Sequence, residues 1–438
     1  MAQECDNKLI RQTFSRSAGT FRDPRAVIMS QTAAWAARIR QELVGNILPF
    51  WMCHAVDRMN GGFYGAIDEN LHVEAEAERS AVLNTRILWT FSAASRLIGR
   101  EYRETADWAY DAITRQFLDP QCGGLFWMLD YRGNPVSTRK QTYAQAFGIY
   151  ALTEYFLATD NPASLDHAIG LFHLIEEHSY DLVLKGYLEA HTRDWGVLAD
   201  VRLSAKDLSS PKSMNTHIHI LEAYTNLLRA WRDPSLVAKQ SALLELTMER
   251  IVDPLSGHFR LFFDEEWNSL SDLVSYGHDI EGSWLIVEAA EVLGDAGMIE
   301  RARTLAVKMA TAVYEQGLDR DGSLFYAADP QGKLVDPKKH WWAQAEAVIG
   351  FYNAYQISRD GRFLHASRRA WDYIEAKVVD KVHGEWHAKL SPEGVVLMAQ
   401  EDPDAQLAGP WKCPYHNARV CYEMIGRLEE KTNGMRAS

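Results

Sequence analysis

A glycine closely followed by aromatic residues recurs six times along this chain of 438 residues. Successive repeat glycines are separated by 62, 62, 71, 65 and 62 residues, which leaves room for two ordinary helices and a hairpin. A period above about 50 residues with two helices in each unit is typical of a stacked or closed helical array. The repeat glycines are Gly62, Gly124, Gly186, Gly257, Gly322 and Gly384. Six units predict an all-α fold, an (α/α)6 barrel with short β-hairpins between helices. An open solenoid would show the same period, but the number six favours closure.

Helical periodicity is clearest in the segments 85–97, 216–231 and 342–357. Each carries apolar residues three or four positions apart, the spacing of a helix that buries one face. A further helix is predicted to begin after Ser275, which can cap it, and to stop at Gly294. These helices would alternate with the hairpins that the repeat glycines mark.

Charge and composition narrow the class of protein. The net charge is −13 and Lys and Arg form no cluster, which argues against nucleic acid as a partner. No apolar run is long enough to cross a bilayer, and residues 1–25 lack the apolar core of a signal peptide, so we expect a cytoplasmic protein that does not bind membranes. The five cysteines form no CxxC pair, as expected of reduced thiols. The expected organisation is a flexible tail (1–25), one catalytic domain (26–430) and a C-terminal tail (431–438).

One pair of polar residues lies at the start of a predicted helix. His278 and Glu281 are three positions apart, so the imidazole and the carboxylate are expected on one helical face. A carboxylate beside an imidazole can fix its tautomer and tune its basicity, as acid–base chemistry requires. The alternative is that His278 only bonds the backbone at the helix start.

Polar residues recur after the repeat glycines at comparable distances. Arg86, Tyr143, His219, His278, Glu346 and His416 each follow a repeat glycine by 19 to 33 residues. If each marks the helix start after a hairpin, all six project from the same end of the barrel. Convergent His, Glu and Arg side chains in a concave site are typical of an active site. The tryptophans in the segment 340–346 (HWWAQAE) lie among polar residues, a composition typical of sugar binding.

Several motifs carry a resemblance to a known family. The segments 83–89 (LNTRILW), 214–219 (MNTHIH), 277–281 (GHDIE) and 342–346 (WAQAE) resemble the N-acylglucosamine 2-epimerase superfamily. The segment 411–417 (WKCPYHN) narrows the resemblance to the cellobiose 2-epimerases. The resemblance extends over residues 51–428, nearly the whole chain.

The resemblance implies an (α/α)6 barrel that inverts C2 of the reducing-end sugar in a β-1,4-linked disaccharide through a cis-enediolate. It implies His278 and His416 as the two bases, with no cofactor and no metal. It further assigns O1 and O2 binding to Arg86, Asn215 and His219, orientation of the imidazoles to Glu281 and Glu346, stacking on the sugars to Trp342 and Trp411, and a place in the pocket lining to Tyr143. The expected partner is a small oligosaccharide, and the expected state is a monomer.

Other interpretations remain open at this stage. Asn215 and His219 could bond each other, Glu281 and Glu346 could be surface charges, and Trp411 could pack a loop. An aldose–ketose isomerase could use the same barrel and return the proton to C1. An inverting glycoside hydrolase would need two separated carboxylates, for which Glu281 and Glu346 are candidates. A metal site from His219, His278 and His416, or a sugar-binding protein without catalysis, would be further alternatives.

Overall fold

The computed structural model describes residues 24–437, and in this part of the chain the inner helices close into a ring. The inner helices are α3 (Ala81–Leu97), α5 (Thr142–Thr159), α7 (Met214–Ala230), α9 (Tyr276–Leu293), α11 (Trp341–Ser358) and α13 (Tyr415–Ala437). Each of them packs against the next one along the chain, and α13 returns to pack against α3. This last contact closes the ring. The (α/α)6 barrel is therefore confirmed, and the open solenoid is excluded.

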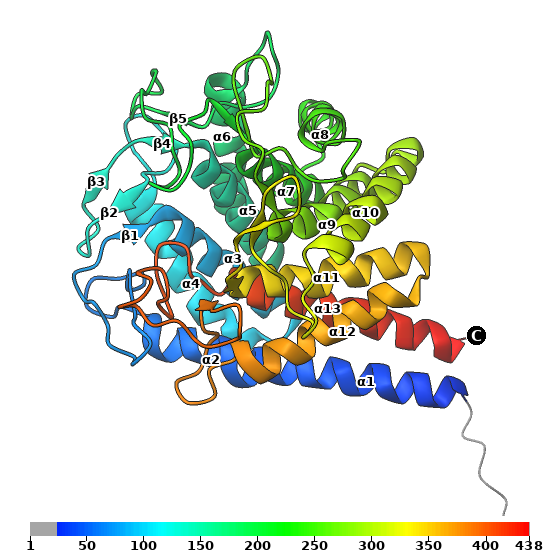
Figure 1. Ribbon diagram of the computed structural model, residues 1–438. Helices are drawn as coiled ribbons and strands as arrows, with labels where there is room; N and C mark the ends of the chain where they lie inside the picture. The colour runs from blue at the N-terminus through cyan, green and yellow to red at the C-terminus, as the bar shows by residue number, and fades with distance from the viewer. Residues whose placement is uncertain (1–23, 438) are drawn as a thin grey trace, which may run out of the picture.

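A second layer of helices surrounds the ring (Figure 1). The outer helices are α1 (Pro24–Glu42), α4 (Arg103–Ala112), α6 (Pro162–Leu174), α8 (Pro234–Leu246), α10 (Ala296–Gln316) and α12 (Gly361–Tyr373). They pack on α13, α3, α5, α7, α9 and α11 in that order. An outer helix buries one stripe, as α12 does with Phe363, Ala366 and Ala370, whereas the inner α5 is buried on all sides over residues 142–155. This difference in burial sorts the helices into two layers.

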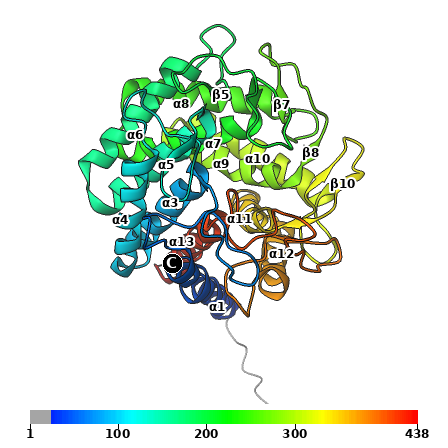
Figure 2. The ribbon, with the colours of Figure 1, turned by 90° about the vertical axis from the view of Figure 1, so that its left-hand side faces the viewer.

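Short strands connect the layers at one end of the barrel, while the three-residue helix α2 (Leu48–Phe50) belongs to the helical run that continues from α1. The strands are β1 (Arg79–Ser80), β2 (Met128–Leu129), β3 (Pro135–Ser137), β4 (Lys140–Gln141), β5 (Ala190–His191), β6 (Lys212–Ser213), β7 (Phe262–Phe263), β8 (Val274–Ser275), β9 (Ala327–Ala328), β10 (Leu334–Asp336), β11 (Lys339–His340) and β12 (Lys389–Leu390). Strands β1, β4, β6, β8 and β11 each end directly before an inner helix and pair antiparallel with β2, β5, β7, β9 and β12. The inner helices α3, α5, α7, α9 and α11 therefore begin at the same end, which faces the viewer in Figure 2.

The repeat glycines hold the tight turns that follow the outer helices. All six have positive φ, from 68° at Gly62 to 97° at Gly322, a conformation that residues with a Cβ rarely adopt. The residue after Gly62, Phe63, forms a bridge with Val56 across this turn, and the other five repeats contain an equivalent bridge. The repeat predicted from the sequence is confirmed as a structural repeat.

An ion pair with a buried cation joins the turn to the following strand in four repeats, a feature that the sequence did not predict. The pairs are Arg79–Asp57, Lys140–Asp119 (3.0 Å), Lys212–Asp181 (2.9 Å) and Lys339–Asp319 (2.7 Å). In each pair the cation lies two residues before an inner helix. These pairs fix the position at which each of those helices begins.

The predicted helices are present, with shifted ends. The helix predicted over 85–97 begins four residues earlier, because Ser80 caps it by accepting a hydrogen bond from the Leu83 backbone N–H. At the C-terminus, residues 431–437 continue α13 instead of forming the expected tail, since good helix formers such as Glu and Lys lead into this segment. Of the predicted N-terminal tail, residues 1–23 lie outside the described residues, while α1 begins at Pro24. Among the described helices, none is sufficiently long and apolar to cross a membrane.

Candidate active site

The predicted site residues lie together at the end of the barrel that carries the short strands, which we call the hairpin end. They lie on α3 (Arg86), α5 (Tyr143), α7 (Asn215, His219), α9 (His278, Glu281), α11 (Trp342, Glu346), α13 (His416) and the loop before α13 (Trp411). Direct contacts link most of them, for example Arg86 Nη2 to the Tyr143 hydroxyl at 2.7 Å and the rings of Trp342 and His416 with centroids 5.4 Å apart. The barrel thus gathers side chains that are more than 300 residues apart in the sequence.

His416 is paired with a carboxylate from the neighbouring helix. Its Nδ1 lies 2.7 Å from Oε1 of Glu346, and both side chains are buried. When Glu346 is ionised its carboxylate only accepts hydrogen bonds, and Nδ1 of His416 then carries the proton and leaves a lone pair on Nε2. This contact places Glu346 where it can orient the imidazole, and its role in catalysis stays a prediction.

His219 has an equivalent partner that the sequence reasoning missed. Its Nδ1 lies 2.9 Å from Oε2 of Glu222, which is buried one turn further along α7. The alternative pairing of His219 with Asn215 is not found, and the Asn215 Oδ1 is buried without a hydrogen-bond partner among the described residues. The spacing of three residues between His219 and Glu222 is the one noted for His278 and Glu281, so the signal was present in the sequence.

His278 is held by Ser275, so the predicted pairing with Glu281 is wrong. The Ser275 hydroxyl lies 2.7 Å from the His278 Nδ1, and the ring of His278 packs at 4.7 Å from that of Trp342. Ser275 occupies the predicted N-cap position, but its side chain bonds the imidazole instead of a backbone N–H. Glu281 instead turns towards α13, where Nη2 of Arg419 donates a hydrogen bond to its Oε1.

Burial keeps the three imidazoles of the site neutral at pH 7. Burial lowers the pKa of His278 to about 3, with a smaller effect from His219. Burial, together with Arg419 and Arg86, lowers the pKa of His416 well below its usual value, and burial also lowers that of His219. All three rings are therefore neutral near pH 7 and able to accept a proton.

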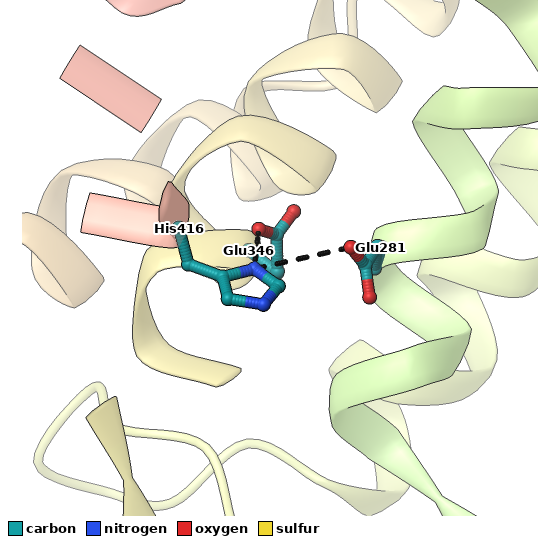
Figure 3. A group of neighbouring side chains, drawn as sticks. All are labelled: Glu281, Glu346 and His416. Carbon is teal, nitrogen blue, oxygen red and sulfur yellow. Dashed lines mark hydrogen bonds and ion pairs between the residues drawn. The ribbon is translucent and has the colours of Figure 1, made fainter. Parts of the chain in front are cut away.

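Arg419 links three buried carboxylates, and the sequence reasoning missed it. Its Nη2 donates to Oε1 of Glu281 at 2.5 Å and to Oε1 of Glu346 at 2.7 Å, and its Nη1 donates to Glu222. Figure 3 shows Glu281 and Glu346 facing each other beside His416. Arg419 follows His416 by three residues, the same spacing that separates His219 from Glu222 and His278 from Glu281. The alternative that Glu281 and Glu346 are surface charges is therefore wrong.

The protonation states of these carboxylates differ. Burial and the nearby Glu346 raise the pKa of Glu281 to about 8, so this carboxyl carries a proton at neutral pH. Burial would raise the pKa of Glu222 too, but Arg419 and His219 outweigh burial and lower it to about 2. The site therefore combines an ionised Glu222 with a protonated Glu281.

Arg86 is a buried cation without a carboxylate partner among the described residues. Only 3% of its surface is exposed, and its guanidinium lies 4.3 Å from the ring centroid of Phe147 and 4.7 Å from that of Tyr415. Besides Tyr143, it approaches the Cys413 sulfur at 3.9 Å. A cation in this setting is suited to stabilising negative charge that develops on a bound molecule.

Aromatic rings line the entrance to the polar cluster. The ring centroid of Trp411 lies 5.9 Å from that of Tyr143 and 6.2 Å from that of Trp127, and the indoles of Trp411 and Trp342 are partly exposed. Partly exposed indoles beside hydrogen-bonding groups match the two sides of a sugar ring, its C–H face and its hydroxyls.

A metal ion at this cluster would compete with Arg419. One ligand atom each of Glu281, Glu346 and His416 lies within 4.8 Å of the others, the only such group found among the described residues, so the alternative three-histidine site is not formed. The guanidinium of Arg419 already bonds both carboxylates, and Nδ1 of His416 is engaged by Glu346. The donor atoms of this group are thus committed to one another.

A separate cavity of about 1270 Å³ lies at the opposite end of the barrel. Its walls come from the C-terminal parts of the inner helices and from α10, and carry paired charges such as Arg229–Glu288 (2.7 Å) and Arg303–Glu291 (2.7 Å). None of the predicted site residues lines it. The imidazole–carboxylate pairs of the candidate site lie at the hairpin end, away from this cavity.

The fold and the site together define an all-α barrel enzyme with buried imidazole–carboxylate pairs at one end. The profile of the N-acylglucosamine 2-epimerase (GlcNAc 2-epimerase) family matches residues 62–408. The chain is 46% identical over 389 residues to the cellobiose 2-epimerase of Bacteroides fragilis, covering 89% of this chain and 98% of that protein. The chain belongs to the N-acylglucosamine 2-epimerase family and is an isomerase of the epimerase class.

Solved structures agree with this assignment. The cellobiose 2-epimerase of Bacillus thermoamylovorans superposes with a TM-score of 0.84 at 41% identity, covering 90% of this chain and 100% of that chain. A D-mannose isomerase superposes with a TM-score of 0.77 at 20% identity, covering 89% of this chain and 97% of that chain. At that lower identity the likeness shows a shared fold.

Proposed function

We propose that this enzyme inverts C2 of the reducing-end sugar in β-1,4-linked disaccharides, such as cellobiose, lactose or mannobiose. The observation that carries the proposal is the pair of neutral imidazoles, His278 on α9 and His416 on α13, which both pack against the ring of Trp342. Relatives with high identity over nearly their full length are named cellobiose 2-epimerases, which supports the disaccharide as substrate.

The chemistry requires two bases near one carbon atom. In the open-chain sugar the carbonyl at C1 acidifies the C2 proton, and its removal gives a cis-enediolate. One imidazole takes this proton from one face, and the other delivers a proton to the opposite face, which inverts C2. The accepting imidazole must be neutral, and the delivering imidazole must carry a proton that it takes from solvent and releases to C2. We assign these two roles to His278 and His416.

Other groups would stabilise the enediolate. Arg86 offers a buried positive charge that is not neutralised by a carboxylate, which suits an oxyanion at O1 or O2. His219 and Asn215 lie one turn apart on α7, and the unpaired Oδ1 of Asn215 can accept a hydrogen bond from a sugar hydroxyl. Trp342 and Trp411 would stack on the two sugar rings, and Tyr143 would orient Arg86 through its hydroxyl.

The alternative reactions make different demands on the site. An aldose–ketose isomerase could use the same barrel and the same enediolate, with the proton returned to C1. An inverting glycoside hydrolase needs two carboxyl groups about 6.5–9.5 Å apart with a water between them. Glu281 and Glu346 approach within 4.8 Å and share one Arg419 nitrogen, which argues against that role.

Conversion of cellobiose in D2O tests the proposal. Imidazole protons exchange with solvent, so we expect glucosyl-mannose with deuterium at C2 of the reducing sugar and none at C1, as measured by NMR. Activity should survive EDTA and need no nucleotide. A ketose product labelled at C1 would replace the epimerase by an isomerase, and free monosaccharides would indicate a hydrolase. An epimer without deuterium at C2 would refute proton exchange with solvent at the two imidazoles.

A further inference from the structure

Arg419 lies at the centre of a hydrogen-bond network that connects two imidazoles. Only 2% of its side chain is exposed, and it donates to Glu222 on α7, Glu281 on α9 and Glu346 on α11. Its Nη1 also donates to the hydroxyl of Tyr415. One side chain on α13 therefore ties together three other inner helices at the depth of the site.

The carboxylates that Arg419 binds are the ones that hold the imidazoles. Glu346 Oε1 accepts from both Arg419 Nη2 (2.7 Å) and His416 Nδ1 (2.7 Å). Glu222 accepts from Arg419 on Oε1 and from His219 Nδ1 on Oε2 (2.9 Å). Each imidazole is thus joined to the guanidinium through one carboxylate, and Nη2 of Arg419 also lies 3.5 Å from Nδ1 of His416.

The tautomer of each imidazole depends on the charge of its carboxylate. An ionised carboxylate accepts the Nδ1 proton and leaves a lone pair on Nε2, whereas a protonated one donates to Nδ1 and forces the proton onto Nε2. In a buried site a carboxyl without a cation tends to become protonated. Burial indeed raises the pKa of Glu346, and Arg419 opposes that rise.

We infer that Arg419 is a positioning residue that keeps Glu222 and Glu346 ionised and thereby holds His219 and His416 as Nδ1–H tautomers with a free Nε2. The part of this inference that concerns turnover rests on the proposed function. The part that concerns tautomers does not depend on the reaction.

The direction of the pH effect follows from the groups around the two carboxylates. The charged and titratable side chains around the two carboxylates and their imidazoles are Arg86, Tyr143, Tyr150, His219, His278, Glu281, Glu288, Tyr415, His416 and Arg419. Of the two cations in this group, only Arg419 bonds the carboxylates directly. Without it the pKa of Glu346 and of Glu222 should rise, so the active ionised form would require a higher pH.

The variant Arg419→Gln, with Arg427→Gln as control, tests this inference. Arg427 lies on the same helix two turns further along and bonds Asn353 and Gln356 away from the site. In 15N-histidine NMR spectra of the unliganded protein, with signals assigned through His416→Gln and His219→Gln, we expect Nε2 of His416 and His219 to be unprotonated in the parent protein. In Arg419→Gln at least one of them should become protonated at Nε2 at pH 7.

Turnover provides the second readout. We expect kcat of Arg419→Gln to fall about 100-fold or more with little change in KM, since a wrong tautomer removes the base but not the binding surface. The acid limb of its kcat profile should move to higher pH, so that part of the activity returns in alkaline buffer. Arg427→Gln should match the parent protein in tautomers and in pH profile.

Several results would overturn the inference. Unchanged tautomers in a folded Arg419→Gln would do so, as would a loss of activity that no pH restores. If that variant does not fold, Arg419→Lys takes its place, because an ammonium cannot reproduce the fork geometry of a guanidinium that bridges Glu222 and Glu346. An unshifted acid limb in Arg419→Lys would then refute the inference. If the tautomers change as expected but the parent protein has no epimerase activity, the proposed function fails and the role of Arg419 stands.

Discussion

Two buried arginines in the site should affect stability in opposite directions when they are replaced by methionine. Arg86 and Arg419 are 3% and 2% exposed. Arg86 has no carboxylate partner among the described residues, whereas Arg419 bonds three. A buried charge without a counter-charge costs folding free energy, and removing it relieves that cost.

The change in the free energy of unfolding expected for Arg86→Met follows from the contacts that are lost and the charge that is removed. Desolvation of a buried ion costs several kcal/mol, but Arg86 recovers part of this through Tyr143 and its cation–π contacts with Phe147 and Tyr415, worth about 0.5–2 kcal/mol each. We therefore expect Arg86→Met to raise the free energy of unfolding by about 1–2 kcal/mol. At about 2.1 cal/mol/K of unfolding entropy per residue, each kcal/mol shifts the Tm of a chain of 438 residues by about 1 °C.

Arg419→Met should instead lower the free energy of unfolding by about 3–5 kcal/mol, because it leaves buried carboxylates without their cation. Calorimetry and urea unfolding measure both variants, and the assay with cellobiose should show that each has lost most of its turnover. A clear fall in the Tm of Arg86→Met, or retention of its epimerase activity, would refute the assignment of Arg86 as an uncompensated charge kept for catalysis.

Four further predictions concern the bases, the aromatic wall, pH and the fold. His278→Ala and His416→Ala should each stay folded by circular dichroism and lose about 1000-fold or more in kcat; near-normal turnover in either would remove that residue from the two-base pair. Trp411→Ala should weaken apparent affinity for cellobiose by about 1–3 kcal/mol, and unchanged KM and kcat would place the ring outside the binding site. Because burial lowers the pKa of His278 to about 3 and that of His416 and His219 as well, the unfolded chain binds more protons below about pH 6.5. Relative to His278→Gln, the parent protein should therefore lose stability in urea as pH falls from about 6.5 towards 3, and this comparison cancels the opposite contribution from the raised pKa of Glu281. An equal dependence on pH in both proteins would contradict a neutral imidazole at His278. Lys140→Met should lower the free energy of unfolding by about 2–4 kcal/mol, less than a fully unpaired Asp119 would cost because Arg193 still bonds it at 2.8 Å; a change below about 0.5 kcal/mol would show that the pair does not stabilise the turn.

The periodic features of the fold could be predicted from the sequence because they depend on local conformation. A glycine at positive φ, such as Gly62 or Gly384, marks a turn wherever it occurs, and apolar spacing marks a buried helix face. The resemblance to the family placed the candidate site residues, and all of them lie at one end of the barrel. Helix ends were less predictable, since caps such as Ser80 act through a single hydrogen bond.

The partners of the charged side chains were decided by the tertiary structure. The sequence placed His278 beside Glu281 on one helical face, yet Glu281 bonds Arg419 on another helix and His278 bonds Ser275. Ring closure brings α13 against α3 and α11, which places Arg419 among carboxylates from three other helices. Local spacing shows which side chains can meet on one helix, but a buried ion selects the strongest partner within reach in three dimensions, and only the closed barrel determines which partners are within reach.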